Sequence, residues 1–101
     1  MVMAEIKNKN QAYLDMDDKY VNPVLSRSAR IVAERASGSY IYDMNGDAYL
    51  DMGTGIAVNS VGHCHPKVVA AAKAQLDQLM HTSVTTHHQR YIELAKKLVE
   101  I

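Results

Sequence analysis

The sequence has no tryptophan, no phenylalanine, one cysteine and only two prolines. A single thiol, Cys64, cannot form an intrachain disulfide, which is typical of a reducing compartment, so we expect a cytoplasmic protein. No segment approaches the roughly 18 apolar residues of a membrane span, and the polar start MVMAEIKNKN does not resemble a secretory signal. The sequence therefore predicts neither export nor membrane insertion.

The sequence also has no excess of positive or negative charge. Lys and Arg together number 11, as do Asp and Glu, so the formal net charge is zero. Nucleic acids and anionic membranes attract proteins with a positive surplus, which predicts that neither is a partner here. A chain of 101 residues has room for one domain at most.

The first half of the sequence predicts a short helix followed by strands. After a polar lead over residues 1–9, Asn10 is expected to cap a helix over residues 11–21. Three runs rich in β-branched or aromatic residues follow, ARIVAERA, SYIYD and AYLDM. Ser37-Gly38 and Asn45-Gly46 separate them, and Asn-Gly is the pair that a type I′ hairpin turn prefers. We predict a small antiparallel meander.

Two amphipathic helices are predicted in the second half. Pro66 can occupy the first position of a helix, because its missing N–H is not needed there. Apolar residues then recur at helical spacing from Val69 to Met80, about four turns, and again from Tyr91 to Val99, so one face of each helix should be buried. The helical pattern continues to Ile101 with no stop signal, which is typical of a truncated segment.

The run GTGIAVNSVGHCHPKVVAAA, residues 53–72, holds most of the reactive side chains. A metal site at His63, Cys64 and His65 lacks a second ligand pair at a familiar spacing. Catalysis by the thiol would need a facing base, so an inert, partly buried Cys64 is favoured. We expect both histidine rings to satisfy loop and helix-end amides, with Gly62 allowing a tight turn. GTGIAV could bind a phosphate through its backbone amides, but it lacks the third glycine of the G-x-G-x-x-G motif, so it indicates a phosphate site only weakly.

Aspartates recur at four-residue intervals across the second hairpin, at Asp43, Asp47 and Asp51. A metal or acid–base role is one interpretation. Aspartates at turns and strand ends commonly bond nearby backbone amides, and this local role is the favoured interpretation.

The order of these motifs is more specific than any one of them. The chain reads YIYDMNGDAYLDM, then GIAVN, then GHCHP, then a helix over KVVAAAKAQLDQL that ends at MHTS. From about Tyr20 to Ile101 this resembles the N-terminal region of class III, pyridoxal-phosphate-dependent aminotransferases, which include 4-aminobutyrate, acetylornithine and ornithine aminotransferases. The resemblance implies an α+β segment, a meander plus two helices, of an α/β enzyme of PLP fold type I that is homodimeric as the full-length parent.

The resemblance also implies a division of the chain. Residues 1–19 would be a tail and short helix, and residues 20–101 the N-terminal segment of the small domain leading into the large domain. In the family a lysine, an aspartate and a helix N-terminus hold pyridoxal phosphate. Their motifs do not occur here, so the PLP-binding large domain is expected to be absent, this chain to hold no catalytic, cofactor or metal residue, and the chain alone to be inactive.

The resemblance also implies that residues of this chain line one side of the substrate-binding site. Ile56 corresponds to a substrate-facing position in 4-aminobutyrate aminotransferases, whereas ornithine-type enzymes have tyrosine there, and Thr54 and Gly55 shape the same wall. Isoleucine suits an aliphatic chain better than a second charged amine, which implies an omega-amino acid such as 4-aminobutyrate as donor and 2-oxoglutarate as acceptor. From the sequence alone, without the resemblance, an ordinary packed side chain is the favoured interpretation of Ile56.

Other functions stay open at this point. An ornithine or acetylornithine aminotransferase, or an aminomutase or epimerase of the same family, would share these motifs. A non-catalytic module that completes a partner's site is the alternative from another class.

Overall fold

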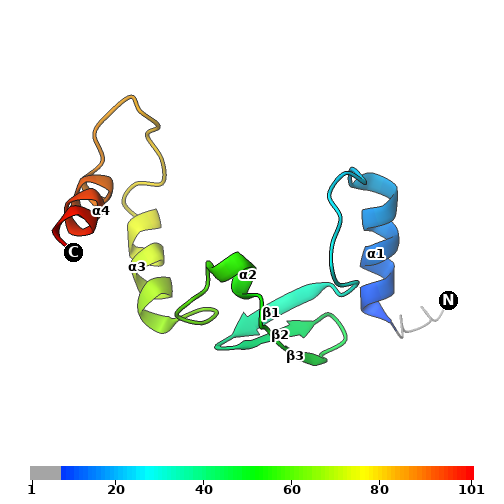
Figure 1. Ribbon diagram of the computed structural model, residues 1–101. Coiled ribbons are helices and arrows are strands. Elements are labelled where there is room, and N and C mark those ends of the chain that lie inside the picture. Colours follow the sequence, from blue (N-terminus) through cyan, green and yellow to red (C-terminus); the bar gives the residue numbers. More distant parts are fainter. Residues whose placement is uncertain (1–7) are drawn as a thin grey trace. The chain divides into compact units, whose positions relative to one another are not determined.

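The computed structural model describes residues 8–101. Figure 1 shows the elements in chain order: α1 (Lys9–Tyr20), β1 (Ala33–Ser37), β2 (Tyr40–Asp43), β3 (Ala48–Leu50), α2 (Thr54–Ala57), α3 (Pro66–Leu76) and α4 (Gln89–Glu100). The chain divides into two compact units between His65 and Pro66. The first contains α1, the strands and α2, and the second contains α3 and α4.

The predicted meander is confirmed. The strands form one antiparallel sheet in the order β1-β2-β3. Ser37 pairs with Tyr40, which leaves a two-residue loop whose first residue, Gly38, has a φ of 56°. A glycine with positive φ at this loop position is the pattern of a type II′ hairpin turn, which follows the twist of the strands it joins.

The second hairpin has a different turn from the one predicted. The type I′ prediction is wrong, because Gly46 has a positive φ, 92°, and Asn45 does not. The Gly46 amide donates to the Asp43 carbonyl at 3.0 Å, and the Asp43 amide donates to the Asp47 carbonyl at 3.0 Å. These bonds define a three-residue loop with a glycine bulge. The Asp43 carboxylate favours it by accepting the Asn45 and Asp47 amides, each at 2.9 Å.

Helix α1 begins earlier than predicted. Its N-cap is Asn8, whose Oδ1 accepts the Gln11 amide at 3.0 Å. The prediction of Asn10 as the cap is wrong, because Asn10 lies inside the helix and its side chain is buried against the sheet. The predicted polar lead falls mostly outside the described residues.

The second unit also departs from the predicted boundaries. Helix α3 ends at Leu76, after three turns and not four. A tighter bond from the Gln78 amide to the Gln75 carbonyl, 3.0 Å, closes it. Helix α4 begins after His88, whose Nδ1 accepts the Arg90 amide at 3.1 Å. The prediction named His63 and His65 for such a role at a helix end; the ring that performs it is that of His88, and Nδ1 of His65 accepts no amide in the described chain.

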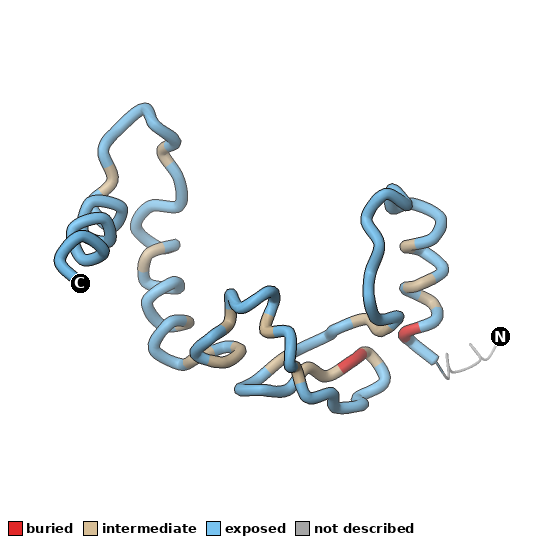
Figure 2. The backbone as a smooth tube through the Cα atoms, in the orientation of Figure 1, coloured by how far each residue is buried: buried red, intermediate tan, exposed pale blue. Residues whose placement is uncertain are grey.

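Burial is sparse throughout the described chain. In residues 8–101 no apolar residue is buried, and the two buried residues, Asn10 and Asp43, are polar (Figure 2). The prediction that α3 and α4 each bury one face is wrong for this chain: Leu76 of α3 is 57% exposed and Leu98 of α4 is 65% exposed. A helix buries its apolar stripe only where another layer packs on it. No helix of residues 8–101 is long and apolar enough to cross a membrane.

Candidate functional site: a left-handed turn held by Asp51 and His63

The segment that follows β3 folds into a left-handed turn. Four consecutive residues of α2 have positive φ: Thr54 at 46°, Gly55 at 63°, Ile56 at 59° and Ala57 at 64°. Only the glycine adopts this conformation freely, and each residue with a Cβ pays about 1–2 kcal/mol. Contacts elsewhere must offset several kcal/mol to hold this turn.

The Asp51 carboxylate supplies one of these contacts. Its Oδ1 accepts the Gly53 amide at 2.9 Å and the Thr54 amide at 2.8 Å. Within the turn, the Ile56 amide donates to the Gly53 carbonyl at 2.9 Å, and the Asn59 amide donates to the Thr54 carbonyl at 2.9 Å. The local role favoured for this aspartate is therefore confirmed.

The second carboxylate oxygen of Asp51 bonds His63. Nε2 of the ring lies 2.6 Å from Oδ2, and the two side chains are 16% and 11% exposed. An ionised carboxylate can only accept, so the ring N–H donates. The His63 bond and the Thr54 amide hold the pKa of Asp51 below its ordinary 3.8, against the opposing effect of burial. The expectation that the His63 ring satisfies a backbone amide is wrong, because Asp51 accepts the amides and His63 holds Asp51.

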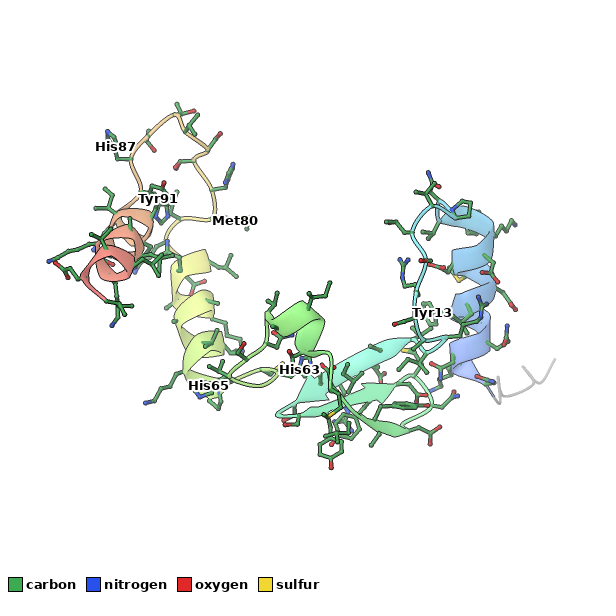
Figure 3. The ribbon with its side chains drawn as sticks, viewed as in Figure 1. Tyr13, His63, His65, Met80, His87 and Tyr91 are labelled. Carbon is green, nitrogen blue, oxygen red and sulfur yellow. The ribbon has the colours of Figure 1, made fainter. Side chains whose placement is uncertain are left out.

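Both ends of this loop are fixed on the turn between β1 and β2. The Asp51 amide donates to the Ser39 carbonyl at 2.8 Å, and His63 exchanges two backbone bonds with Gly38, at 2.8 and 3.1 Å. Gly62 makes this approach possible, since its φ is 89° and a Cβ there would lie 3.4 Å from the Gly38 backbone. The predicted tight turn at Gly62 is confirmed, and His63 lies at the foot of α2 (Figure 3).

The three predicted substrate residues lie together on this turn. Ile56 is 96% exposed, while Thr54 is half-buried and Gly55 is exposed. Within the described chain Ile56 therefore does not pack as an ordinary core residue. A β-branched, apolar side chain on a strained turn and open to solvent is unusual, since large apolar side chains normally gain free energy by burial.

A second polar cluster, which the sequence did not predict as a unit, joins α1 to the sheet. Asn10 donates from Nδ2 to Oδ2 of Asp43 at 2.6 Å, and the Tyr49 hydroxyl donates to the same oxygen at 3.1 Å. Burial alone raises the pKa of Asp43, but bonds from Asn10, the Asp47 amide, Tyr49 and the Asn45 amide lower it below 3.8. The local role of Asp43 is confirmed. The one sequence signal for this cluster is the asparagine itself, since asparagine is less favourable than most residues inside a helix and is retained there when its side chain has a partner.

The remaining reactive side chains form no centre of their own. Cys64 is exposed, with φ of 53°, so the partly buried thiol was wrong: the surface turn before α3 carries it outward. His65 Nδ1 is buried and has no hydrogen-bond partner among the described residues. Residues 8–101 contain no group of three His, Cys, Asp or Glu side chains placed to hold a metal.

No lysine of the described chain lies in a site that would suit a cofactor such as pyridoxal phosphate. The lysines of the described chain are all exposed: Lys9, Lys19, Lys67, Lys73, Lys96 and Lys97. A lysine that forms a Schiff base needs a desolvated site that lowers its pKa. The residues present here do not form such a site, and no chemical step through the cofactor follows from this segment.

A cavity in the described chain lies away from the turn. It measures about 620 Å³ and lies between α1 and residues 21–33. Exposed charges border it, including Arg30 and Asp18, which pair at 2.9 Å. None of the three predicted substrate residues lines this cavity.

Comparisons with known proteins identify the family. The profile of the Aminotransferase class-III family matches residues 21–101. The acetylornithine aminotransferase of Methanocaldococcus jannaschii is 45% identical over 88% of this chain and 22% of its own length. That of Myxococcus xanthus is 52% identical over 68% of this chain and 17% of its own length. This chain therefore spans about a fifth of these relatives.

A solved structure agrees in fold. The adenosylmethionine-8-amino-7-oxononanoate aminotransferase of Methanocaldococcus jannaschii superposes with a TM-score of 0.79 and 29% identity, over 89% of this chain and 22% of its own. Relatives named for different amino donors thus share the fold of this segment. The predicted fold class, an α+β piece of a PLP fold type I aminotransferase, is confirmed. The chain belongs to the class-III aminotransferase family and corresponds to an N-terminal segment of its members.

Proposed function

We propose that this segment belongs to a longer, PLP-dependent aminotransferase that moves the terminal amino group of an N-acetylornithine-like donor to a 2-oxo acid such as 2-oxoglutarate. The observation that carries the proposal is the 45% identity to an acetylornithine aminotransferase over 88% of the chain. In this proposal residues 20–101 lead into a large domain that lies outside this chain and binds the cofactor. The parent is a cytoplasmic homodimer.

The exposed Ile56 side chain supports donors with one free amine. It offers apolar contact and no hydrogen bond, so it pairs well with the methylenes of a donor and poorly with a second ammonium group. N-acetylornithine has one free amine because the other is acetylated, and 4-aminobutyrate also has one, whereas ornithine has two. The comparisons favour acetylornithine over the 4-aminobutyrate expected from the sequence, and Ile56 keeps 4-aminobutyrate as the second candidate.

The proposed contribution of this chain is to bind and orient the donor. Thr54, Gly55 and Ile56 would form one wall of the substrate site, presented by the left-handed turn. When bound, pyridoxal phosphate supplies the electron sink for amino transfer, and residues elsewhere in the longer protein would hold it.

The test uses the full-length protein with PLP and 2-oxoglutarate. Glutamate formation is measured with N-acetylornithine, 4-aminobutyrate and ornithine as donors. We expect kcat/KM for N-acetylornithine to exceed that for ornithine by at least about tenfold. A preference for ornithine contradicts the role of Ile56, and a donor isomerised without glutamate formation indicates an aminomutase or epimerase.

A second arm separates the enzyme from a non-catalytic module. Residues 1–101 alone should catalyse no transamination and should not develop the absorbance of bound PLP. Activity in this segment would contradict the assignment of cofactor binding to the rest of the protein. A full-length protein that is inactive with every donor until a partner is added would favour the module.

A further inference from the structure

We propose that His63 is a positioning residue for donor binding: through Asp51 it holds the left-handed turn that presents Ile56. This inference rests on the proposed function, since it assigns Ile56 to the donor site. His63 itself lies at the foot of the turn and does not touch the donor.

His63 is itself fixed. Its backbone exchanges bonds with Gly38 at 2.8 and 3.1 Å, on the turn between two sheet strands. Its ring is 16% exposed and reaches Oδ2 of Asp51 at 2.6 Å. A side chain held at its backbone and at its tip has little rotational freedom, so it can fix the orientation of its partner.

Asp51, held by His63, fixes the start of the turn. With Oδ2 held by His63, Oδ1 faces the amides of Gly53 and Thr54 at 2.9 and 2.8 Å. Without the ring, rotation of the carboxylate would exchange these bonds for bonds to water. The positive φ values of the next four residues would then lose an anchor at their first amide.

The turn determines where Ile56 points. Ile56 is 96% exposed, so no packing contact among residues 8–101 fixes its position, and within this segment the backbone of the turn sets its direction. Disorder at the turn would weaken donor binding while the chemical groups of the enzyme stay in place. A loss of this kind raises KM and leaves kcat nearly unchanged.

The test compares two substitutions of His63 in the full-length enzyme, glutamine and asparagine, whose side-chain amides differ in length. In His63→Gln the amide nitrogen stands as many bonds from Cβ as Nε2 does, so it can still donate to Asp51. In His63→Asn the nitrogen stands one bond closer and does not reach. We expect His63→Asn to raise KM for N-acetylornithine about tenfold with kcat within about twofold, and His63→Gln to restore KM to within about threefold of wild type. His81→Ala, an exposed histidine between α3 and α4, is the matched control and should change neither constant.

A double-mutant cycle separates positioning from general destabilisation. If His63 acts through Ile56, adding His63→Asn to Ile56→Ala should raise KM by less than about twofold further. Additive effects, a KM unchanged in His63→Asn, or no recovery in His63→Gln would each overturn the proposal. Far-UV circular dichroism checks that each variant is folded.

Hydrogen exchange gives a readout that does not depend on activity. In the full-length protein the Gly53 and Thr54 amides should exchange at least about tenfold faster in His63→Asn than in wild type or His63→Gln. If wild type uses none of the donors, the proposed function fails, and these rates decide whether His63 holds the turn. Unchanged rates in His63→Asn overturn the positioning role.

Discussion

Asn10 and Asp43, which are 33 residues apart, share a side-chain hydrogen bond of 2.6 Å. Asn10 also accepts the Val32 amide at 3.2 Å and the Met44 amide at 3.4 Å. One side chain thus joins α1, the entry to β1 and the β2–β3 loop. Helix α1 precedes residue 21, where the family match begins, so this asparagine joins a helix outside the matched region to the sheet inside it.

Replacing Asn10 should loosen that junction. Asn10→Ala removes the acceptor of the Val32 amide, and an amide left unpaired costs about 1–3 kcal/mol. We expect the Val32 amide to exchange with solvent about 10- to 100-fold faster, and the Met44 amide less so, because it also donates to the Val32 carbonyl at 3.0 Å. Gln11→Ala, which removes an exposed bond to Asp15 from the same helix, is the control and should leave both rates unchanged. Equal effects in the two variants would contradict the junction.

Protonation of Asp43 and Asp51 at low pH should weaken the hydrogen bonds that their carboxylates accept. The folded-state pKa values of Asp43 and Asp51 both lie below 3.8, so the folded form binds fewer protons than the unfolded form. Their contribution to stability is then complete above about pH 3.8 and is lost as the pH falls below it. Exchange of the Thr54 and Asp47 amides, measured between pH 5 and 2 and corrected for intrinsic rates, should show protection that decreases with acid. Protection that increases with acid would contradict these pKa directions.

Alanine substitutions at Gly62 and Gly38 test the close approach of the two backbones. Gly62→Ala places a Cβ 3.4 Å from the Gly38 backbone at a φ of 89°, while Gly38→Ala has a positive φ but meets no atom within 4 Å. Gly62→Ala should cost more than about 1 kcal/mol and weaken the Gly38–His63 bridge, because its φ of 89° lies beyond the left-handed region that a residue with a Cβ can adopt. Gly38→Ala, with a φ of 56°, should cost less. Denaturant unfolding of the full-length protein, with exchange of the His63 amide, measures both. A larger loss in Gly38→Ala would show that the close approach is unimportant.

Substitution of Ile56 should change donor preference. Ile56→Ala removes apolar contact and should lower kcat/KM for N-acetylornithine about tenfold or more, while Ile56→Tyr should raise the ratio of ornithine to N-acetylornithine activity. The exposed Val84, which lies between α3 and α4, is the control: Val84→Ala should leave the ratio unchanged. If neither Ile56→Ala nor Ile56→Tyr changes the activity with either donor, Ile56 does not line the donor site.

Short-range signals explain what the sequence predicted well. The meander follows from turn residues next to alternating strands, and the family from motifs that lie in one continuous stretch. The turn type was wrong because the Asp43 carboxylate, which bonds two amides of the loop, outweighed the Asn-Gly preference. That effect needs a side-chain orientation, which residue pairs do not reveal.

Long-range contacts explain what the sequence missed. Asn10 was predicted as a cap because its partner, Asp43, is distant in the chain. The left-handed turn was missed because only one of its four residues is a glycine, and contacts with Asp51 hold the others in place. The predicted burial of α3 and α4 failed since periodicity shows which face is apolar and not what covers it.

The absence of a buried apolar residue in residues 8–101 has a calorimetric consequence. The heat-capacity increment of unfolding arises mainly from apolar surface that becomes hydrated, and polar surface contributes with the opposite sign. The contacts described within this segment are mostly hydrogen bonds and ion pairs, so melting them alone should change the heat capacity little. Its local stability should therefore vary only gently with temperature, while the curvature of the full-length protein's stability should come from the surfaces that cover its apolar stripes.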